Sequence, residues 1–223
     1  MLFTIALHGA TALSTVVVFR RDIAELFQGI FKFRWNESTR FALFVVISML
    51  PVFVVGVFFK DEIESLFEGN PVLVGSSLVF TAILLYSTTR IPTQDGKVNG
   101  WRALVVGIAQ AIAVLPGVSR SGSTISTALL IGVSRERAAR FSFLMVLPVI
   151  FGAMILEARD FAEAQPQRAI DNYALLVGFI AAFAAGVLAC RWMIAIVKRS
   201  KLDYFAYYCL GVGLIAIGYG LLS

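Results

Sequence analysis

Charged residues are scarce in this sequence. Of its 223 residues only 15% are Asp, Glu, Lys or Arg, whereas 59% are hydrophobic and the mean hydropathy is +0.85. Soluble domains carry roughly 25% charged residues. The composition therefore excludes an ordinary soluble protein and indicates a chain whose solvent is the lipid bilayer.

Cysteine and histidine are rare, since the sequence contains two cysteines and one histidine. Cys190 and Cys209 lie in two different apolar segments, where free thiols behave as small hydrophobic side chains. We therefore predict no disulfide and no redox role. The single histidine, His8, lies in the first apolar segment. Two roles remain open for it: a packed side chain with a satisfied hydrogen bond, and a group that transfers protons.

Long apolar runs are abundant. A helix needs about 20 apolar residues to cross about 30 Å of hydrocarbon. Six segments of the sequence meet or approach this length: 1–19, 41–59, 71–89, 141–157, 173–197 and 204–222. The first is not a cleaved signal peptide, because its basic residues follow the apolar run and it has no small-residue cleavage site. We predict six transmembrane helices.

Segment 101–133 differs from these six. Its first part, 101–115, would form about 22 Å of helix, and its second part, 124–133, is shorter still, so neither crosses alone. A helix breaker, Pro116-Gly117, and a polar stretch separate the two parts. Such a loop cannot face lipid and must be buried in protein or line a wet cavity. We predict a re-entrant helix-loop-helix.

The distribution of Lys and Arg supports this topology. Basic residues gather in segments 20–40, 90–102, 134–140 and 198–203, whereas loops 60–70 and 158–172 hold few. If 101–133 returns to the side from which it entered, all four basic segments lie on the cytoplasmic side and both chain ends lie outside. The net charge of +5 is explained by these segments, so it gives no reason to expect a nucleic-acid partner.

The predicted fold is an all-α polytopic membrane protein in a single domain, 1–223, with an internal repeat. Residues 3–23 are weakly similar to 141–161, which suggests a first repeat over 1–100 and a second over 101–223. Each repeat has three crossings, an odd number, so the two would be inverted in the membrane. The first repeat lacks the re-entrant element that opens the second.

Segment 115–126, LPGVSRSGSTIS, has the chemistry of a phosphate cradle. An arginine inside a membrane is costly and marks a functional site by default, and the planar guanidinium of Arg120 suits two phosphate oxygens at once. The N-terminus of the second half-helix attracts anions. The neighbours that we expect to bind phosphate oxygens are Ser119, Ser121, Ser123, Thr124, Gly117 and Gly122.

Structural roles remain open for some of these residues. Arg120 could bond only to backbone carbonyls, and we expect Ser126 to bond back to its own helix. Gln110, six residues before the breaker, faces either the same cavity or a neighbouring helix.

The sequence resembles the undecaprenyl pyrophosphate phosphatases, the bacitracin-resistance family. The resemblance rests on GIAQAIAVLPGVSRSGSTIS (107–126) followed by SRERAARFSFLMVLPVIFGAMILE (134–157), with the specific core PG-x-SRSG-x-T, and it extends through 6–23, Asn70-Pro71 and 205–214. It implies an enzyme of the bacterial inner membrane, open to the outer side, that hydrolyses a C55 isoprenyl diphosphate to the monophosphate. This reaction recycles the lipid carrier of cell-wall synthesis, and bacitracin competes for the same lipid.

The resemblance also implies roles for individual residues. Catalytic roles fall to Arg120, Ser119 and Ser121. Phosphate binding falls to Gly117, Gly122, Ser123, Thr124 and Gln110. The resemblance also implies a divalent metal ion, Mg²⁺, as cofactor. Before the first crossing, family members have a second re-entrant element with a Glu-x-x-x-Glu pattern and a Ser-Ser-x-Gly-His stretch, to which the roles of metal ligand and of nucleophile or base are assigned.

Neither of these two patterns lies before the first apolar segment, where the family has them, and His8 does not correspond to the family histidine. The only carboxylate inside the apolar segments is Glu157, at a membrane edge, so no pair is available to hold a metal or accept a proton. We therefore expect an anion-binding half-site without its catalytic half, as in an N-terminally truncated or degenerate member, and we expect the 223 residues alone to be inactive.

Two other functions stay open. Inverted repeats and broken helices are also features of transporters, so a flippase for a polyprenyl phosphate or another anion is the first alternative. A non-catalytic membrane fragment that stabilises a partner is the second. The oligomeric state is left open, a homodimer included.

Overall fold

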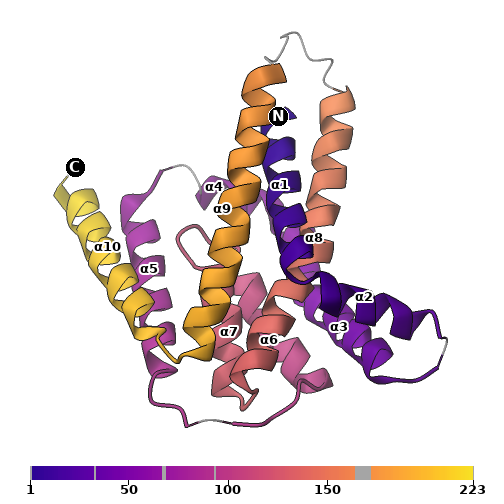
Figure 1. Cartoon of the computed structure of the whole chain (residues 1–223). Coiled ribbons are helices and arrows are strands. Elements are labelled where there is room, and N and C mark those ends of the chain that lie inside the picture. The colour runs from indigo at the N-terminus through magenta and orange to yellow at the C-terminus, as the bar shows by residue number, and fades with distance from the viewer. Residues whose placement is uncertain (1, 33, 67–68, 93, 164–171, 223) are drawn as a thin grey trace. The chain divides into compact units, whose positions relative to one another are not determined.

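The computed structural model describes residues 2–32, 34–66, 69–92, 94–163 and 172–222, which contain ten helices and no strand (Figure 1). The helices are α1 (Leu2–Val18), α2 (Arg20–Ile30), α3 (Glu37–Phe58), α4 (Lys60–Leu66), α5 (Pro71–Ser87), α6 (Gly100–Ile112), α7 (Arg120–Leu130), α8 (Arg135–Glu163), α9 (Asn172–Lys198) and α10 (Asp203–Leu222). The all-α prediction is confirmed.

Each of the six predicted crossings contains a helix, but the number of spans is not confirmed. By length and composition four helices qualify as membrane spans: α3, α8, α9 and α10. A fifth span results if α1 and α2, which are bent by 79°, are taken together, and α5 and α6 are shorter apolar helices. The chain is a polytopic membrane protein. Helices α2 and α4 fall where the sequence predicted only loops.

Two compact units make up the chain. Unit 1 consists of 1–39 and 143–195, and unit 2 of 40–142 and 196–223. The division into inverted repeats at residue 100 stays a prediction.

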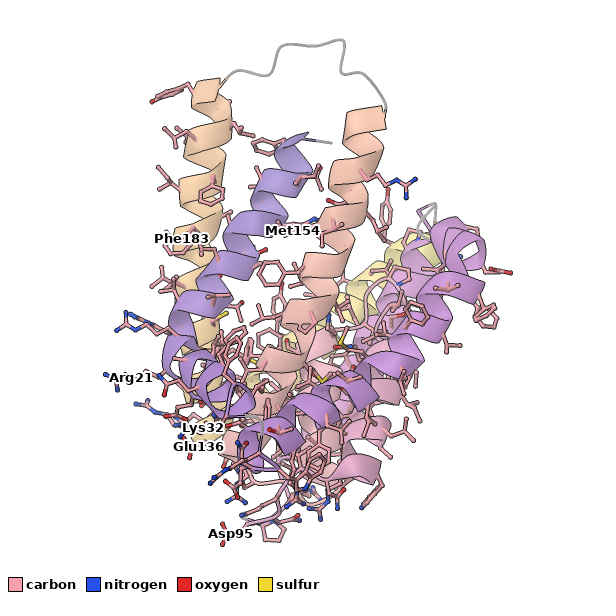
Figure 2. All side chains as sticks on the ribbon, turned by 90° about the vertical axis from the view of Figure 1, so that its right-hand side faces the viewer. Arg21, Lys32, Asp95, Glu136, Met154 and Phe183 are labelled. Carbon is pink, nitrogen blue, oxygen red and sulfur yellow. The ribbon has the colours of Figure 1, made fainter. Side chains whose placement is uncertain are left out.

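In unit 1, α1 lies between α8 and α9 (Figure 2). A Cβ added at Gly9 of α1 would lie 3.3 Å from the terminal methyl of Met154, and the rings of Phe19 and Phe143 are 5.4 Å apart, so α1 and α8 are antiparallel. On the other side, the Thr15 hydroxyl lies 3.7 Å from the Cys190 sulfur. Small residues on α1 thus let long apolar helices approach each other.

In unit 2, α5 and α10 form the most extensive helix pair, and they approach each other at glycines. A Cβ on Gly75 would lie 2.7 Å from the carbonyl oxygen of Gly213, and a Cβ on Gly213 would lie 2.8 Å from that of Gly75. A Cβ on Gly220 would lie 2.8 Å from a methyl carbon of Val72. Because the later residue of α10 lies beside the earlier residue of α5, the two helices are antiparallel. A side chain at any of these glycines would separate the helices.

Helices α6 and α7 form a hairpin whose two ends meet. An isolated bridge joins Gly96, before α6, to Val133, after α7, and the N–H of Ser134 donates to the Gly96 carbonyl at 3.0 Å. The side chain of Asn99 caps α6 by accepting from the N–H of Arg102. The predicted helix-loop-helix is therefore confirmed as a hairpin, whereas its path into a membrane stays a prediction.

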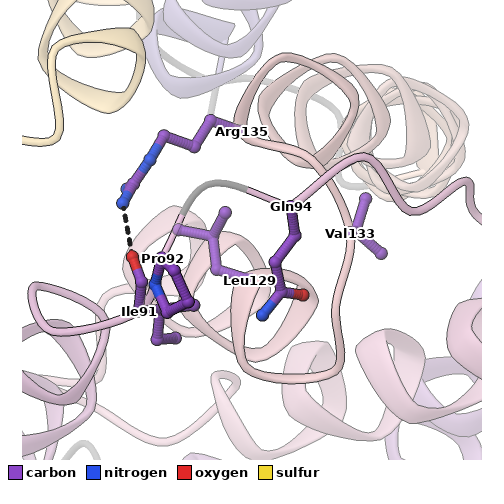
Figure 3. Close-up of a pocket in the computed structure, with 6 residues that line it drawn as sticks. All are labelled: Ile91, Pro92, Gln94, Leu129, Val133 and Arg135. Carbon is purple, nitrogen blue, oxygen red and sulfur yellow. Dashed lines mark hydrogen bonds between the residues drawn. The ribbon is translucent and has the colours of Figure 1, made fainter.

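Three of the predicted cytoplasmic segments lie together in unit 2, at this end of the hairpin. Arg135 donates to the carbonyl of Ile91 at 3.2 Å (Figure 3). Both residues line a small cavity with room for about one water molecule. Arg137 donates to the carbonyl of Asp95 at 2.7 Å, and Lys198 pairs with Glu136 at 2.7 Å. Segments 90–102, 134–140 and 198–203 therefore share one side of unit 2, as their charges predict.

Candidate functional site

The tip of the hairpin is a tight turn packed against α5. Gly117 has φ +89°, a conformation that L side chains rarely adopt. A Cβ at this position would lie 2.5 Å from the carbonyl oxygen of Val74 and 3.0 Å from the Cβ of Ser77. The close approach of Gly117 is to α5, so glycine is required here for packing as well as for its backbone angle.

Ser119 begins α7 as its N-cap. Its side chain accepts from the N–H of Gly122 at 3.2 Å, and its carbonyl accepts from the N–H of Ser123 at 2.8 Å. The N–H of Ser119 itself donates to the hydroxyl of Thr81 on α5 at 3.1 Å. Thr81 is fully buried and was not predicted, although its i, i+4 spacing with Ser77 already suggested a polar stripe on α5.

Two backbone donors remain at the start of α7. The N–H of Gly122 donates to the Ser119 hydroxyl, so it is not available to a ligand. The sequence had suggested Gly122 as a phosphate contact. The N–H groups of Arg120 and Ser121, the first two of the helix, make no hydrogen bond within the described part of the chain. They lie at the positive end of the helix dipole, so they are free to bind an anion.

Arg120 is the first residue of α7, and its side chain is exposed. Among the described residues no carboxylate, hydroxyl or carbonyl forms a hydrogen bond or an ion pair with its guanidinium. The structural alternative, in which Arg120 bonds only to backbone carbonyls, therefore finds no support in the described residues. An unpaired guanidinium beside two free N–H groups is a cationic site without its anion.

The serines and the threonine around Arg120 differ in what they offer. The hydroxyl of Thr124 donates to the carbonyl of Arg120 at 2.9 Å and lies 2.6 Å from the Ser142 hydroxyl of α8. Thr124 therefore supports its own helix and presents no free donor. The hydroxyl protons of Ser119 and Ser121 have no acceptor within the described residues, so both remain available to a ligand.

Several buried polar atoms lie on α6 and α7. The amide nitrogen and oxygen of Gln110, which is 2% exposed, have no hydrogen-bond partner among the described residues, and neither do the hydroxyls of Ser123 and Ser126. The expectation that Ser126 bonds back to its helix is wrong, because its hydroxyl has no partner among the described residues, whereas Thr124 does make such a bond. An unsatisfied buried polar group costs roughly 1–3 kcal/mol. Water or ligand oxygens are the natural partners of these atoms.

The only histidine belongs to unit 1 and has a carboxylate partner. His8 Nδ1 lies 3.2 Å from Oε2 of Glu157, with side chains that are 47% and 36% exposed. The pair joins α1 to α8 and gives His8 the satisfied role that the sequence left open. The structure does not assign either residue to the Arg120 site, which lies in unit 2.

No metal site is formed by the described residues. Among them, no three His, Cys, Asp or Glu side chains gather closely enough to hold a metal ion. The hydroxyls and the arginine around residue 120 are poor ligands for a hard divalent cation, which prefers carboxylate oxygens. The described residues therefore do not fit the divalent ion that the resemblance implies.

Comparisons with known proteins agree on one family. The model of the family described as bacitracin resistance protein BacA matches residues 1–215. A protein of Christiangramia forsetii named undecaprenyl-diphosphatase is 51% identical over 218 residues, which are 97% of this chain and 81% of that protein. Proteins of the same name from Bacteroides fragilis and Korarchaeum cryptofilum are 48% and 38% identical, over 96% and 95% of this chain and 82% of each relative.

Proposed function

Because this chain belongs to the bacitracin resistance protein BacA family, we propose that it hydrolyses undecaprenyl diphosphate to undecaprenyl phosphate and inorganic phosphate. The name undecaprenyl-diphosphatase, borne by relatives up to 51% identical, supports this activity. The observation that carries it is Arg120, an exposed guanidinium without a partner among the described residues, at the N-terminus of α7.

Arg120 and the first turn of α7 would bind the terminal phosphate. A guanidinium donates two parallel hydrogen bonds to two phosphate oxygens, and such charge-assisted bonds are about twice as strong as neutral ones. The free N–H groups of Arg120 and Ser121 add two donors that point along the helix dipole. Together these groups hold the phosphorus in a fixed orientation and stabilise the charge on its oxygens during the reaction.

The reaction breaks the bond between the inner phosphate's bridging oxygen and the outer phosphorus. A nucleophile attacks the outer phosphorus, and undecaprenyl phosphate departs. We propose Ser119 or Ser121 for this attack, because their hydroxyl protons are free among the described residues. The serine loses its proton to water and forms a phosphoserine, and a water molecule then attacks the phosphorus of the phosphoserine, which restores the serine hydroxyl and releases inorganic phosphate. Neither hydroxyl contacts a carboxylate or an imidazole in the described part of the chain, so a base is not assigned.

A divalent ion, Mg²⁺, is the expected cofactor from the family resemblance. It would neutralise phosphate charge. Because the described residues do not form a ligand set for it, we assign it no step.

The predicted topology supports a location for the site. We propose that the protein lies in the bacterial inner membrane and that its site opens to the outer side, opposite the basic segments of unit 2. Bacitracin would then compete for the same lipid. Transport of a polyprenyl phosphate is not favoured, since the named relatives are diphosphatases.

Hydrolysis can be measured on the purified protein reconstituted in nanodiscs. We expect phosphate release from undecaprenyl diphosphate, and we expect Arg120→Ala to abolish it. Arg20→Ala is the matched control, because Arg20 is likewise an exposed first residue of a helix, α2. Full activity of the Arg120 variant would exclude the proposed role, and movement of intact lipid without phosphate release would favour a flippase.

A further inference from the structure

Helix α2 is strongly amphipathic. Ile23, Phe27, Ile30 and Phe31 follow one another at the spacing i, i+4, i+7, i+8, so they lie along one face. The polar side chains of Arg21, Glu25 and Gln28 occupy the opposite face. Such a helix does not span a membrane, because one side of it remains polar.

The apolar face of α2 is not buried by any of the described residues. None of its residues is buried, and Phe27, Ile30 and Phe31 are 57%, 38% and 70% exposed. The rings of Phe27 and Phe31 stack on each other with 6.4 Å between their centres. In water this continuous apolar strip would cost free energy, so it marks an interaction surface.

The polar side of α2 is held by the start of the next helix. Asn36 donates to the carbonyl of Gly29 at 2.7 Å, and Ser38 donates to the carbonyl of Glu25 at 3.3 Å. A Cβ at Gly29 would collide with the Ser38 side chain, so this contact is close. The hydrogen bonds fix the rotation of α2, and its apolar face therefore points away from the chain.

The membrane itself is the occupant that fits this face. Helix α1 is apolar, and α2 leaves it at an angle of 79° directly after Phe19, where the first arginines appear (Figure 1). A helix that turns by this angle at the end of a spanning helix runs along the bilayer surface. Figure 2 places Arg21 and Lys32 at this end of unit 1, away from the level of Met154.

We propose that α2 lies in the plane of the cytoplasmic membrane interface, with Phe27, Ile30 and Phe31 inserted among the acyl chains of phospholipids. Lys32 and Arg34, both exposed, then lie at the level of the lipid phosphates. Trp35, which is 73% exposed, follows them in a position typical of interfacial aromatic residues. The partner of this surface is the phospholipid monolayer, not a second copy of the chain, because continuity with α1 sets its depth in the bilayer.

The proposal can be tested by placing one tryptophan on each face of α2. The three natural tryptophans, Trp35, Trp101 and Trp192, are replaced by Phe, and either Phe27→Trp or Gln28→Trp is added. These adjacent positions are about 100° apart around the helix, with Phe27 on the apolar face and Gln28 on the polar side, so each is the matched control of the other. Both proteins are reconstituted in nanodiscs that contain lipids brominated at a shallow acyl position.

We expect the bromolipids to remove most of the fluorescence of the tryptophan at position 27 and little of that at position 28. Aqueous iodide should give the reverse order. Equal quenching at both positions would overturn the proposal, and so would a blue-shifted emission at position 27 that bromolipids do not quench, because protein would then cover this face. Detection of folded, monodisperse protein before the measurement ensures that neither result reflects misfolding.

Discussion

Two of the helix breaks in the described residues, α1–α2 and α6–α7, differ in how the chain turns. Between α1 and α2 the chain bends by 79° at Phe19, which has φ −99° and ψ 19° and provides no side-chain cap. Between α6 and α7 it makes a loop with Gly117 at φ +89° and Ser119 as a hydrogen-bonding cap. Both second helices begin with an exposed arginine, Arg20 in α2 and Arg120 in α7.

The difference between α2 and α7 indicates what turns the N-terminus of a helix into a binding site. At α2 the apolar residues form an outward face, so the helix is built to contact lipid. At α7 the first turn is anchored on α5 through Thr81, and buried hydroxyls follow it into the unit. An arginine at the start of a helix becomes a binding group only where the backbone around it is held rigidly.

The largest effect is expected from Arg120 itself. Removal of one transition-state donor lowers the rate roughly 10²–10³-fold, and Arg120→Ala also removes a charge, so phosphate release from undecaprenyl diphosphate should fall at least that far. The rate of Arg120→Lys should lie between that of the unchanged protein and that of Arg120→Ala, because lysine keeps the positive charge but lacks the planar guanidinium that donates two parallel hydrogen bonds. Arg20→Ala should change the rate less than about twofold, because surface substitutions away from the site shift energies by about 0.5 kcal/mol or less. Equal losses for Arg20 and Arg120 would remove the distinction between the two helices.

Gly117→Ala should be the most destabilising change in the loop. It places a Cβ 2.5 Å from the Val74 carbonyl at a positive φ, and we expect it to lower the free energy of unfolding by roughly 2–4 kcal/mol. Gly56→Ala on α3 is the control, because no atom lies within 4 Å of the added methyl. Thermal unfolding in detergent measures both. An unchanged midpoint for Gly117→Ala would mean that the loop does not need its tight contact with α5.

Ser119→Ala should have a smaller effect on stability. Loss of an N-cap costs about 1 kcal/mol, whereas Ser121→Ala removes a hydroxyl that has no bond among the described residues and should leave the unfolding midpoint unchanged. Helix α2, with Phe19 at its N-cap, has no such bond to lose. If Ser121→Ala proved the more destabilising of the two, the assigned cap would be incorrect.

The smallest effect is expected in unit 1. His8→Gln weakens the contact with Glu157, but both side chains are partly exposed, so the free energy of unfolding should fall by less than about 1 kcal/mol. Glu157→Gln should have a similar effect, and the double variant should lose no more than either single one, as expected for two partners of one contact. Additive losses in the double variant would show that the two residues do not act as a pair.

Much of this fold could be predicted from the sequence. Runs of apolar residues place helices α1, α3, α5, α9 and α10 within a few residues, because only helices and closed barrels satisfy their backbone hydrogen bonds in lipid. Helix α8 extends six residues beyond its predicted segment at each end. The breaker Pro116-Gly117 and the basic segments predict the hairpin. Helix α2 was missed, although its apolar period was visible, because segment 20–40 was judged by its charge alone.

The candidate site could be predicted only in part. Arg120 and its neighbours stand out because they are polar in an apolar chain. Which hydroxyls are free could not be predicted, since the Thr124 hydroxyl contacts Ser142 of α8 and the Ser119 N–H contacts Thr81 of α5, and both contacts join different helices. Contacts of this kind depend on packing, which a single sequence does not reveal.

The most direct measurement is the nitrogen NMR spectrum of arginine side chains in the reconstituted protein. The Arg120 signal is assigned by its loss in Arg120→Lys, and undecaprenyl diphosphate or undecaprenol is then added. We predict that the diphosphate shifts the Arg120 signal and leaves that of Arg20 unchanged, and that the alcohol shifts neither. An Arg120 signal unmoved by saturating diphosphate would contradict the assignment of the phosphate site to the N-terminus of α7.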